Sequence, residues 1–531
     1  MAKKQKGKHI HLIGIGGTGI SAIARVLLDR GFYVSGSDQE LTSRTAELYA
    51  AGADIFKGHK ASHVTGAQMV VVSSAIPSDN PEIAAAKQAG IPVLKRADLV
   101  GSLMNNNTGI AVAGTHGKTT TTGMIAQILL EAELDPTVIL GDNLPKMGSN
   151  GQAGQGPHFL VEADEYDQMF LGLRPKVGVI TNIEYDHPDS YASKEAYRQA
   201  FEDFIRLLPD NGRLVICAED EEAVSLLKVN SNVTRIAYGI GFPITPTPGL
   251  TLILAQDLKP NDKGGTDFVV EQDMKPLGSI SLRIPGEHNV NNALAAISVA
   301  LFEGISFEVI AKALSEFEGV GRRFEIRGQV NDIIVVDDYA HHPTEIKVTL
   351  AAAKQRYPNR RIWAVWQPHT YSRVKALLPE FATCFKDANQ VIMLDIYRSR
   401  ETDTLGITPA AILKQIKHQQ IQHIGDLTAA VAYLLDHCQP NDVILTLNAG
   451  DARMIGDWLL DGLRERAAEA FANEEYGMGD EEKQQNEKQT DEEKMFKLDA
   501  TASQVRRLVD RLKTAKKENS DSTEETEKKD E

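Results

Sequence analysis

The fold of this chain is decided by the stretch GIAVAGTHGKTT, which runs from Gly109 to Thr120. Its apolar first half predicts a buried strand, and the residues from Lys118 onward predict a helix. Glycines at such a junction let backbone amides surround an anion at the positive end of the helix dipole. The lysine is then placed to reach the β- and γ-phosphates of a nucleotide, and the hydroxyl of Thr119 to bind Mg²⁺. The stretch therefore predicts an α/β fold with a site for a nucleoside triphosphate such as ATP.

The loop departs from the usual phosphate-binding pattern at one position. The pattern G-x-x-x-x-G-K-[ST] has its first glycine where this chain has Val112, so the loop is shorter than in GTPases and motor ATPases. We expect ATP to be held by the residues of the loop, which are Gly114, Thr115, His116, Gly117, Lys118, Thr119 and Thr120.

Strand-like and helix-like runs alternate on both sides of this loop, which is typical of parallel sheets with crossover helices. The stretch Phe242–Pro276 is rich in Pro, Gly and Asp and predicts hairpins or a loop at the edge of a sheet. Charged and amide residues dominate the C-terminal end, so we expect a disordered acidic tail there, with a candidate helix at Ala500–Lys516. Three α/β units and the tail are predicted at residues 1–107, 108–319, 320–466 and 467–531.

Composition and charge exclude several classes of protein. The formal net charge is −16 at pH 7, of which the segment from Phe471 onward, with 18 acidic and 12 basic residues, supplies −6. The remainder is only mildly acidic, which argues against a surface for nucleic acid or for anionic lipids. No apolar run reaches the roughly 20 residues that span a bilayer. The 3 cysteines form no CxxC pair, which is typical of inert thiols in a reducing cytosol. We therefore expect a cytoplasmic protein without nucleic-acid partners or membrane insertion.

A second glycine-rich motif, GIGGTG, runs from Gly14 to Gly19 between a strand-like and a helix-like run. It fits G-x-G-x-x-G, in which glycines let the backbone approach a pyrophosphate. Asp38 ends the next strand-like run, at the point where a ribose hydroxyl is often held. The motif alone does not identify its ligand, because any nucleotide diphosphate needs the same amides. A tight turn without a ligand would also explain it.

Two acidic segments follow strand-like runs of the central unit: EADE at Glu162–Glu165 and NIEYDH at Asn182–His187. Ligands of parallel sheets collect beyond the carboxyl ends of the strands. Carboxylates and an imidazole there would complete, with Thr119, the coordination of phosphate-bound Mg²⁺. Solvated acidic turns are the alternative.

Four further residues lie where nucleotide contacts are expected. His288 and Asn289 stand just ahead of a predicted helix, where both would contact the nucleotide. The alternative is that Asn289 only caps the helix. Arg322 and Arg323 lie at a presumed hinge before the third unit, where an arginine would suit stabilisation of a γ-phosphate. Salt bridges within the hinge would also explain the arginine pair.

Two motifs of the third unit also follow predicted strands. The first, DDYAHHP, spans Asp337–Pro343, and its carboxylates and imidazoles seldom serve packing, although a structural cluster is the alternative. The second, QPHTYSR, spans Gln367–Arg373, and its histidine and arginine would hold the carboxylate of a small amino acid.

Together these segments resemble the Mur ligases, the ATP-dependent amide-forming enzymes of peptidoglycan assembly. The resemblance runs from about His9 to Leu463, and its most discriminating motifs are GVGRRFE, DDYAHHPTEI and QPHTYSR. It implies three domains: a Rossmann-like domain for a UDP-sugar, a central P-loop ATPase domain, and a Rossmann-like domain for an amino acid. Within the family, the motifs resemble the members that use ATP and Mg²⁺ to join L-alanine to UDP-N-acetylmuramate.

The resemblance also implies roles for individual residues. The UDP-sugar would be bound by Gly14, Gly16, Gly17, Thr18, Gly19, Asp38 and Ser74. ATP would be bound by the loop together with His288, Asn289, Arg323 and Asp338. The ligands of Mg²⁺ would be Thr119, Glu162 and His187. The amino acid would be bound by Tyr339, His341, His369 and Arg373. The catalytic residues would be Lys118, Arg323, His341 and His342. We expect His341 or His342 to accept the proton of the incoming amine. A lysine that several relatives carry in carbamoylated form is missing from Tyr197–Asp203, so the way a second metal is held stays open.

Three other functions stay open at this point. A nicotinamide-dependent enzyme would use the motif at Gly14 but would leave the loop at Gly114 unexplained. A P-loop ATPase that acts as a switch would turn over ATP without forming an amide. A sister ligase would attach a recycled murein tripeptide, in place of L-alanine, to UDP-N-acetylmuramate.

Overall fold

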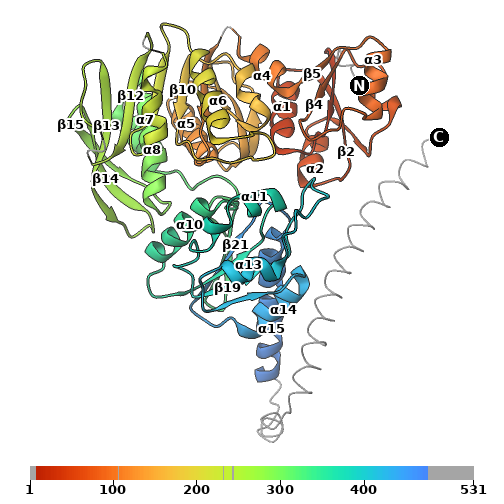
Figure 1. Ribbon diagram of the computed structural model, residues 1–531, viewed down its shortest axis with the longest axis vertical. Helices are drawn as coiled ribbons and strands as arrows, with labels where there is room; N and C mark the ends of the chain where they lie inside the picture. The colour runs from red at the N-terminus through yellow and green to blue at the C-terminus, as the bar shows by residue number, and fades with distance from the viewer. Residues whose placement is uncertain (1–6, 106, 231, 242–243, 476–531) are drawn as a thin grey trace, which may run out of the picture. The chain divides into compact units, whose positions relative to one another are not determined.

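The structure is a computed structural model, and the residues it describes are 7–105, 107–230, 232–241 and 244–475. The chain divides into two compact units, Met1–Arg323 (unit 1) and Phe324–Glu531 (unit 2). In the described residues, unit 1 contains two sheets and unit 2 contains one, each flanked by helices, which confirms the predicted α/β class (Figure 1). The candidate helix Ala500–Lys516 lies outside the described residues.

The first sheet of unit 1 is parallel throughout, in the order β3-β2-β1-β4-β5. The strand order reverses next to β1, and open α/β sheets bind ligands beyond the strand ends at such a point. The GIGGTG motif follows β1, and the predicted contact Ser74 follows β4. The strands are β1 (His9–Ile13), β2 (Tyr33–Asp38), β3 (Asp54–Lys57), β4 (Met69–Val72) and β5 (Val93–Lys95). The helices are α1 (Thr18–Asp29), α2 (Ser43–Ala50), η1 (Ala61–Val64), α3 (Pro81–Gln88) and α4 (Arg96–Met104).

The second sheet of unit 1 has the order β15-β14-β13-β12-β11-β10-β6-β9-β7-β8. Its strands from β13 to β7 are parallel, and β8, β14 and β15 pair in antiparallel fashion at the two edges (Figure 1). The antiparallel strands confirm the hairpins predicted for Phe242–Pro276, apart from residues 242 and 243, which are not described. The strands are β6 (Thr108–Ala113), β7 (Thr137–Leu144), β8 (Ser149–Gln152), β9 (His158–Glu162), β10 (Val177–Ile180), β11 (Arg213–Cys217), β12 (Thr234–Ile240), β13 (Leu250–Pro260), β14 (Thr266–Gln272) and β15 (Lys275–Ser281). The helices are α5 (Lys118–Glu131), η2 (Tyr166–Gly172), α6 (Lys194–Arg206), α7 (Glu221–Ser225), η3 (Leu226–Lys228), α8 (Glu287–Phe302) and α9 (Phe307–Ser315).

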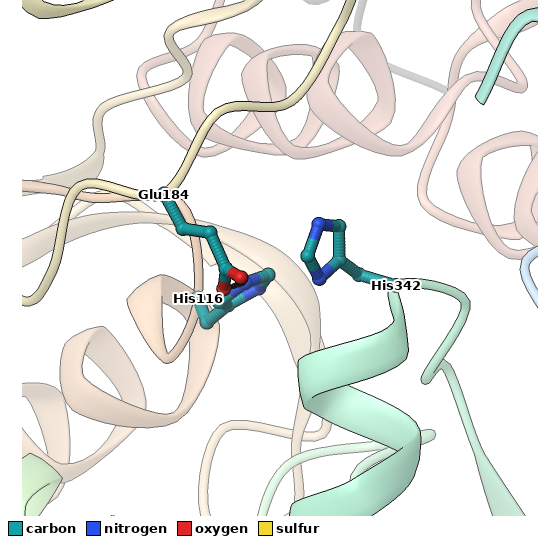
Figure 2. A group of neighbouring side chains, drawn as sticks. All are labelled: His116, Glu184 and His342. Carbon is teal, nitrogen blue, oxygen red and sulfur yellow. Dashed lines mark hydrogen bonds and ion pairs between the residues drawn. The ribbon is translucent and has the colours of Figure 1, made fainter. Parts of the chain in front are cut away.

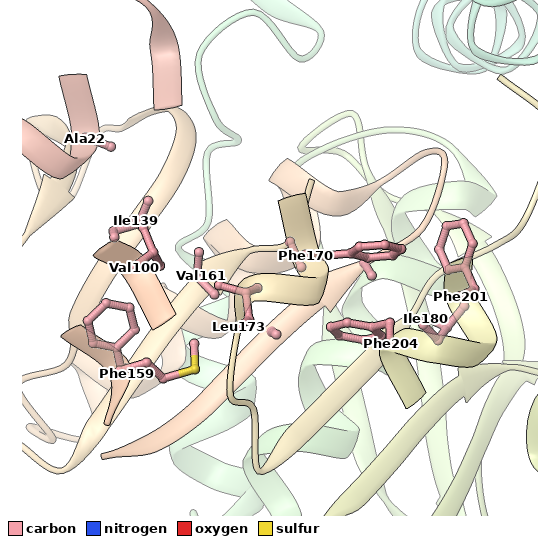
Figure 3. Packing of buried hydrophobic residues seen from close by; sticks show 14 of the residues in the cluster. Ala22, Val100, Ile139, Phe159, Val161, Phe170, Leu173, Ile180, Phe201 and Phe204 are labelled. Atoms are coloured by element: carbon pink, nitrogen blue, oxygen red, sulfur yellow. The ribbon is translucent and has the colours of Figure 1, made fainter. Parts of the chain in front are cut away.

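The two sheets of unit 1 share one apolar cluster. Ala22 of α1 and Val100 of α4 belong to the same buried cluster as Ile139, Phe159 and Val161 of the second sheet (Figure 3). Burying the valine, isoleucine and phenylalanine side chains of this set contributes roughly 1.5–3 kcal/mol each. The shared cluster therefore holds α1 and α4, which border the glycine motif, against the second sheet.

Unit 2 has a single sheet in the order β16-β17-β21-β18-β19-β20, in which only the edge strand β16 is antiparallel. Both predicted motifs of this unit follow central strands, DDYAHHP at the end of β17 and QPHTYSR at the end of β18. The strands are β16 (Glu325–Val330), β17 (Ile333–Asp338), β18 (Arg361–Trp366), β19 (Gln390–Met393), β20 (Ile421–His423) and β21 (Asp442–Leu447). The helices are α10 (Pro343–Arg356), α11 (Tyr371–Ala376), α12 (Leu378–Phe381), α13 (Pro409–Gln415), α14 (Leu427–His437) and α15 (Arg453–Glu475).

The structure differs from the sequence-based expectations at two places. Helix α15 continues to Glu475, so residues 467–475, which we assigned to the disordered tail, are helical. Asn289 does not cap α8, because the helix begins at Glu287 and its N-cap is Gly286. Among the residues that the structure describes, no helix combines the length and the apolarity needed to cross a membrane.

Candidate active site

Two glycines with left-handed backbone angles shape the loop between β6 and α5. Gly114 has φ +136° and Gly117 has φ +80°, a region that L-residues with a side chain rarely adopt. A Cβ atom at Gly114 would overlap the hydroxyl of Thr181, and one at Gly117 would lie 2.5 Å from Oδ1 of Asn292. These positions require glycine, so the loop closes over the start of α5 as a phosphate-binding turn does.

The ammonium group of Lys118 lies in the middle of the loop. Its Nζ donates to the carbonyl oxygens of Gly114 at 2.5 Å and Thr115 at 3.0 Å, and it lies 2.9 Å from Oε2 of Glu165. Burial alone would lower the pKa of Lys118, but the carboxylates of Glu165, Asp164 and Glu162 outweigh it and raise the pKa. Lys118 therefore carries its positive charge inside the loop.

Thr119 and Glu162 form a pair of oxygen donors beside the loop. The Thr119 hydroxyl donates to Oε1 of Glu162 at 3.0 Å, and Oε2 of Glu162 accepts from the amide of Gly141 at 2.8 Å. Burial raises the pKa of Glu162, although the positive charges of Lys118 and Arg323 work against the rise. The influence of Arg323, the last residue of unit 1, indicates that its guanidinium lies within electrostatic range of this pair.

His187 reaches the loop through Glu165. Its Nε2 lies 3.4 Å from Oε1 of Glu165, a carboxylate that is only 1% exposed and also binds Lys118. The Tyr191 hydroxyl donates to the Glu165 carbonyl at 2.5 Å, and the Tyr197 hydroxyl lies 3.5 Å from its Oε1. Of the predicted metal ligands, Thr119 and Glu162 are in contact, whereas the contacts of His187 include Glu165, Asp186 and the ring of Tyr166.

His116 is held by the loop after β10. Its backbone amide donates to Oδ1 of Asn182 at 2.9 Å, and its Nε2 lies 2.9 Å from Oε2 of Glu184. Figure 2 shows the His116 ring directly below the Glu184 carboxylate. The hydroxyl of Thr115 donates to the carbonyl of Glu184 at 2.8 Å. The segment that the sequence singled out for its acidic residues therefore also supports the phosphate loop.

The start of α8 is linked to α5 by polar side chains. Asn289 Nδ2 donates to the carbonyl of Pro285 at 2.7 Å, and its Oδ1 accepts from Asn292 at 3.1 Å. Asn292 in turn accepts from the hydroxyl of Thr121 at 3.1 Å. Desolvation lowers the pKa of the neighbouring His288 to about 4, so its imidazole is neutral at pH 7.

The glycine motif of the first sheet is held by acceptors at the end of β2. The amides of Gly14 and Ile15 donate to the carbonyl of Ser37 at 2.8 and 3.1 Å. Oδ2 of Asp38 accepts from the amide of Gly16 at 2.9 Å. Asp38, predicted as a ribose contact, therefore also fixes the loop. Gly17 is the N-cap of α1, Thr18 and Gly19 are its first residues, and Ser74 is exposed.

A buried carboxylate braces the end of β2. Glu82 of α3 is fully buried, accepts from the Ser37 hydroxyl at 2.6 Å, and lies 2.7 Å from Nδ1 of His63 and 3.1 Å from Nδ1 of His59. Burial alone would raise the pKa of Glu82, but hydrogen bonds from His11, Ser37 and His63 lower it to about 2. No sequence pattern pointed to this group.

The DDYAHHP motif turns sharply after β17. The carboxylate of Asp338 accepts from the amides of Ala340 at 2.7 Å and Phe324 at 2.8 Å. Nδ1 of His341 lies 2.8 Å from the carbonyl of Tyr339, and a carbonyl oxygen only accepts, so Nδ1 carries the proton. His342, drawn in Figure 2 where α10 begins, is the N-cap of that helix, and its Nδ1 accepts from the amide of Thr344 at 3.3 Å.

The QPHTYSR motif forms a second cluster in unit 2. Nδ1 of His369 lies 2.8 Å from Nη1 of the buried Arg373, which only donates, so Nδ1 of His369 is an acceptor. The ring of His369 lies between that of His341, with centroids 5.6 Å apart, and that of Tyr397 at 5.8 Å. Burial raises the pKa of Tyr397, with smaller effects from Asp451 and Tyr339. Within unit 2 the two motifs therefore meet.

The fold and the site define an α/β protein with a glycine loop around Lys118 on one sheet and a second glycine-rich motif on a parallel sheet. Three family models match the chain: "Mur ligase family, catalytic domain" at residues 9–108, "Mur ligase middle domain" at 112–300, and "Mur ligase, glutamate ligase domain" at 322–450. The chain belongs to the Mur ligase family.

Curated relatives and solved structures indicate which members of this family the chain is similar to. The chain is 44% identical to the UDP-N-acetylmuramate–L-alanine ligase of Acetivibrio thermocellus, over 86% of this chain and 96% of that protein. It is 42% identical to the ligase of the same name from Solidesulfovibrio magneticus, over 87% of this chain and 99% of that protein. The crystal structure of UDP-N-acetylmuramate–alanine ligase from Thermotoga maritima matches with a TM-score of 0.71 at 30% sequence identity. The match covers 87% of this chain and 99% of that one. The crystal structure of a murein peptide ligase from Psychrobacter arcticus matches with a TM-score of 0.68 at 26% sequence identity. The match covers 86% of this chain and 99% of that one.

Proposed function

We propose that this protein joins L-alanine to UDP-N-acetylmuramate at the expense of ATP, a step of peptidoglycan biosynthesis. The observation that carries this function is its 44% and 42% identity, over nearly their whole length, to ligases of that name. The loop around Lys118 and the glycine motif at Gly14 would supply the two nucleotide sites that such a reaction needs, and their hydrogen-bonded backbones support this. ATP and a UDP-sugar are cytoplasmic metabolites, so we propose the cytoplasm as its location.

Activation of a carboxylate is the chemical problem that this site would solve. A carboxylate is a poor electrophile, but transfer of the γ-phosphoryl group converts it to an acyl phosphate and leaves ADP. The alanine amine then attacks the carbonyl carbon, the C–N bond forms, and the C–O bond to phosphate breaks. Lys118 and Arg323 would stabilise the charge that develops on the transferred phosphoryl group. The remaining loop residues, together with His288, Asn289 and Asp338, would position the nucleotide.

Oxygen donors beside the loop fit a magnesium ion. Thr119 and Glu162 offer a hydroxyl and a carboxylate 3.0 Å apart, the hard oxygen ligands that Mg²⁺ prefers. We propose that these two residues hold the ion and that His187 completes the site from the side of Glu165. When bound, Mg²⁺ would neutralise charge on the β- and γ-phosphates.

Hydrogen bonding favours His341 over His342 as the acceptor of the amine proton. A neutral His341 with its proton on Nδ1 carries its lone pair on Nε2. The Nδ1 lone pair of His342 is engaged at the start of α10, where this residue acts as a cap. His369 is the reverse case, because its Nδ1 accepts from Arg373 and its Nε2 carries the proton. His369 and Arg373 would therefore donate to the carboxylate of alanine, with Tyr339 lining the same site.

The choice of amine substrate is tested by phosphate release. We expect release from ATP and UDP-N-acetylmuramate to require L-alanine, with little stimulation by a murein tripeptide. Release that responds only to the tripeptide would assign the chain to the murein peptide ligases, to which it is also similar. Release that ignores both amines would indicate an ATPase without an amide product, and bound NADH without ATP turnover would indicate a nicotinamide enzyme.

A further inference from the structure

The loop that follows β19 is bound to the QPHTYSR motif of unit 2 by its backbone. The amide of Tyr397 donates to the carbonyl of Pro368 at 2.8 Å, and the amide of Thr370 donates to the carbonyl of Tyr397 at 2.9 Å. A parallel bridge also pairs Tyr397 with His369, and their rings stack with centroids 5.8 Å apart. The pairing of β18 with β19 therefore continues beyond the strand ends, as far as residues predicted to bind the amino acid.

The backbone at Thr370 has an unusual conformation. Its φ is +62° and its ψ is 142°, a combination that costs free energy in a β-branched residue. Thr370 is the N-cap of α11, but within the described part of the chain its side chain forms no capping hydrogen bond. The first amides of the helix therefore need an acceptor from another segment, and the turn needs a contact that holds it.

Glu401 supplies that acceptor from 30 residues beyond Tyr371 in the sequence. Its Oε2 accepts from the amide of Tyr371, and its Oε1 and Oε2 accept from the amide of Ser372 at 3.3 and 3.2 Å. Hydrogen bonds to a carboxylate are stronger than those between neutral groups, and the positive end of a helix favours a negative charge. Glu401 therefore caps α11 and braces the turn at Thr370.

This cap fixes the two side chains that are proposed to hold the carboxylate of alanine. Arg373 lies in the first turn of α11, is 4% exposed, and has its Nη1 2.8 Å from Nδ1 of His369. His369 directly precedes Thr370, so the conformation at Thr370 sets the distance and the angle between the imidazole and the guanidinium. Without the cap, the turn would relax toward an ordinary conformation and separate the pair.

We propose that Glu401 is a positioning residue of the amino-acid site, which keeps His369 and Arg373 in their paired geometry through the start of α11. The inference rests on the proposed function for the identity of the substrate. Both oxygens of Glu401 accept from backbone amides, so this residue acts on alanine through the two donors and not by contact.

Steady-state kinetics of the full-length chain separates positioning from folding. We expect Glu401→Ala to raise the KM for L-alanine about tenfold or more, because misdirected donors bind its carboxylate weakly, and to change the KM for ATP and for UDP-N-acetylmuramate less than about twofold. A purely structural role would reduce the amount of active protein, which lowers kcat and leaves every KM unchanged. The matched control is Asp403→Ala. Oδ1 of Asp403 accepts from the amide of Leu405 at 2.8 Å in the same loop, so its loss should change the KM for L-alanine less than about twofold.

Two further variants test the connection through Thr370. Thr370→Gly removes the conformational cost at φ +62°, so in that background Glu401→Ala should raise the KM for L-alanine only about threefold or less. Glu401→Gln keeps one acceptor oxygen and should fall between wild type and Glu401→Ala. An unchanged KM for L-alanine in Glu401→Ala would overturn the inference, as would an equal rise in Asp403→Ala or an undiminished rise in the Thr370→Gly background.

The ¹⁵N spectrum of the His369 imidazole tests the inference without any turnover. In the wild type, Nδ1 accepts from Arg373 and Nε2 carries the proton, and the signal is assigned by its absence in His369→Gln. We expect Glu401→Ala to shift the His369 resonances toward a mixture of tautomers and Asp403→Ala to leave them in place. Unchanged resonances in Glu401→Ala would contradict the positioning role. Phosphate release that ignores L-alanine in the wild type would instead refute the proposed ligase function, and the spectrum would still decide the role of Glu401.

Discussion

Replacing Lys118 by methionine separates its role in catalysis from its role in folding. The Lys118 side chain is 13% exposed and Glu165 is 1% exposed, with 2.9 Å between their charged atoms. Removing one partner of a buried ion pair typically costs about 3–5 kcal/mol of stability, because the other charge stays buried. His187 and Tyr197 still contact Glu165, so we expect the lower end of that range. Catalysis is affected separately. The loss of a group that stabilises transition-state charge lowers kcat about 10²–10³-fold.

The double variant Lys118→Met, Glu165→Gln distinguishes the two effects. It removes both charges, so urea unfolding should return most of the free energy of unfolding that the single variant loses. ADP release should stay about 10²–10³ below wild type, because no ammonium faces the phosphates. Recovery of activity together with stability would refute the assignment of Lys118 to phosphate, and so would a single variant with near-normal turnover.

Three other changes test separate parts of the account. Thr119→Val removes the hydroxyl that pairs with Glu162, so the Mg²⁺ concentration for half-maximal activity should rise at least about tenfold, and an unchanged requirement would contradict the proposed ligand. Gly114→Ala places a Cβ against the Thr181 hydroxyl at φ +136°, so ATP affinity should fall more than about tenfold in equilibrium binding, whereas wild-type affinity would mean that the loop relaxes freely. The pKa of Glu82 is about 2 in the folded protein, against an ordinary value of 4.5 for a glutamate, so its stabilising effect is present above pH 4.5 and is lost as the pH falls toward 2. The difference in unfolding free energy between wild type and Glu82→Gln should therefore shrink over that interval, and a constant difference would rule out the charge as its source.

The local sequence predicted the α/β class of the fold and several of the residues that meet beside the loop. Alternating apolar runs and glycine junctions predicted the α/β class, the strand β6 and the helix α5 on either side of the loop, because burial pattern and turn chemistry are local properties. Lys118, Thr119 and Glu162 were likewise found together, since each lies at the carboxyl end of a strand or the start of the helix that follows. The prediction failed where helix ends depend on their surroundings, at Gly286 before α8 and at Glu475 in α15.

Several contacts between segments far apart in sequence were not predicted. Glu165 belongs to a segment that was singled out, but its pairing with Lys118 depends on how β6 and β9 lie side by side. Arg96 carries no motif at all, and its position between Gly19 and Asp164 results from the packing of α4 on η2. Such placements come from tertiary packing, which a single sequence does not encode in its local pattern.

The fate of the muramate carboxylate oxygens tests the central claim most directly. UDP-N-acetylmuramate labelled with ¹⁸O in its carboxylate would be incubated with ATP, L-alanine and the full-length protein, and the products analysed by mass spectrometry. Attack of the carboxylate on the γ-phosphorus, followed by attack of the amine, predicts one ¹⁸O atom in the released phosphate for each amide formed. Label in AMP, or unlabelled phosphate without an amide product, would contradict the account.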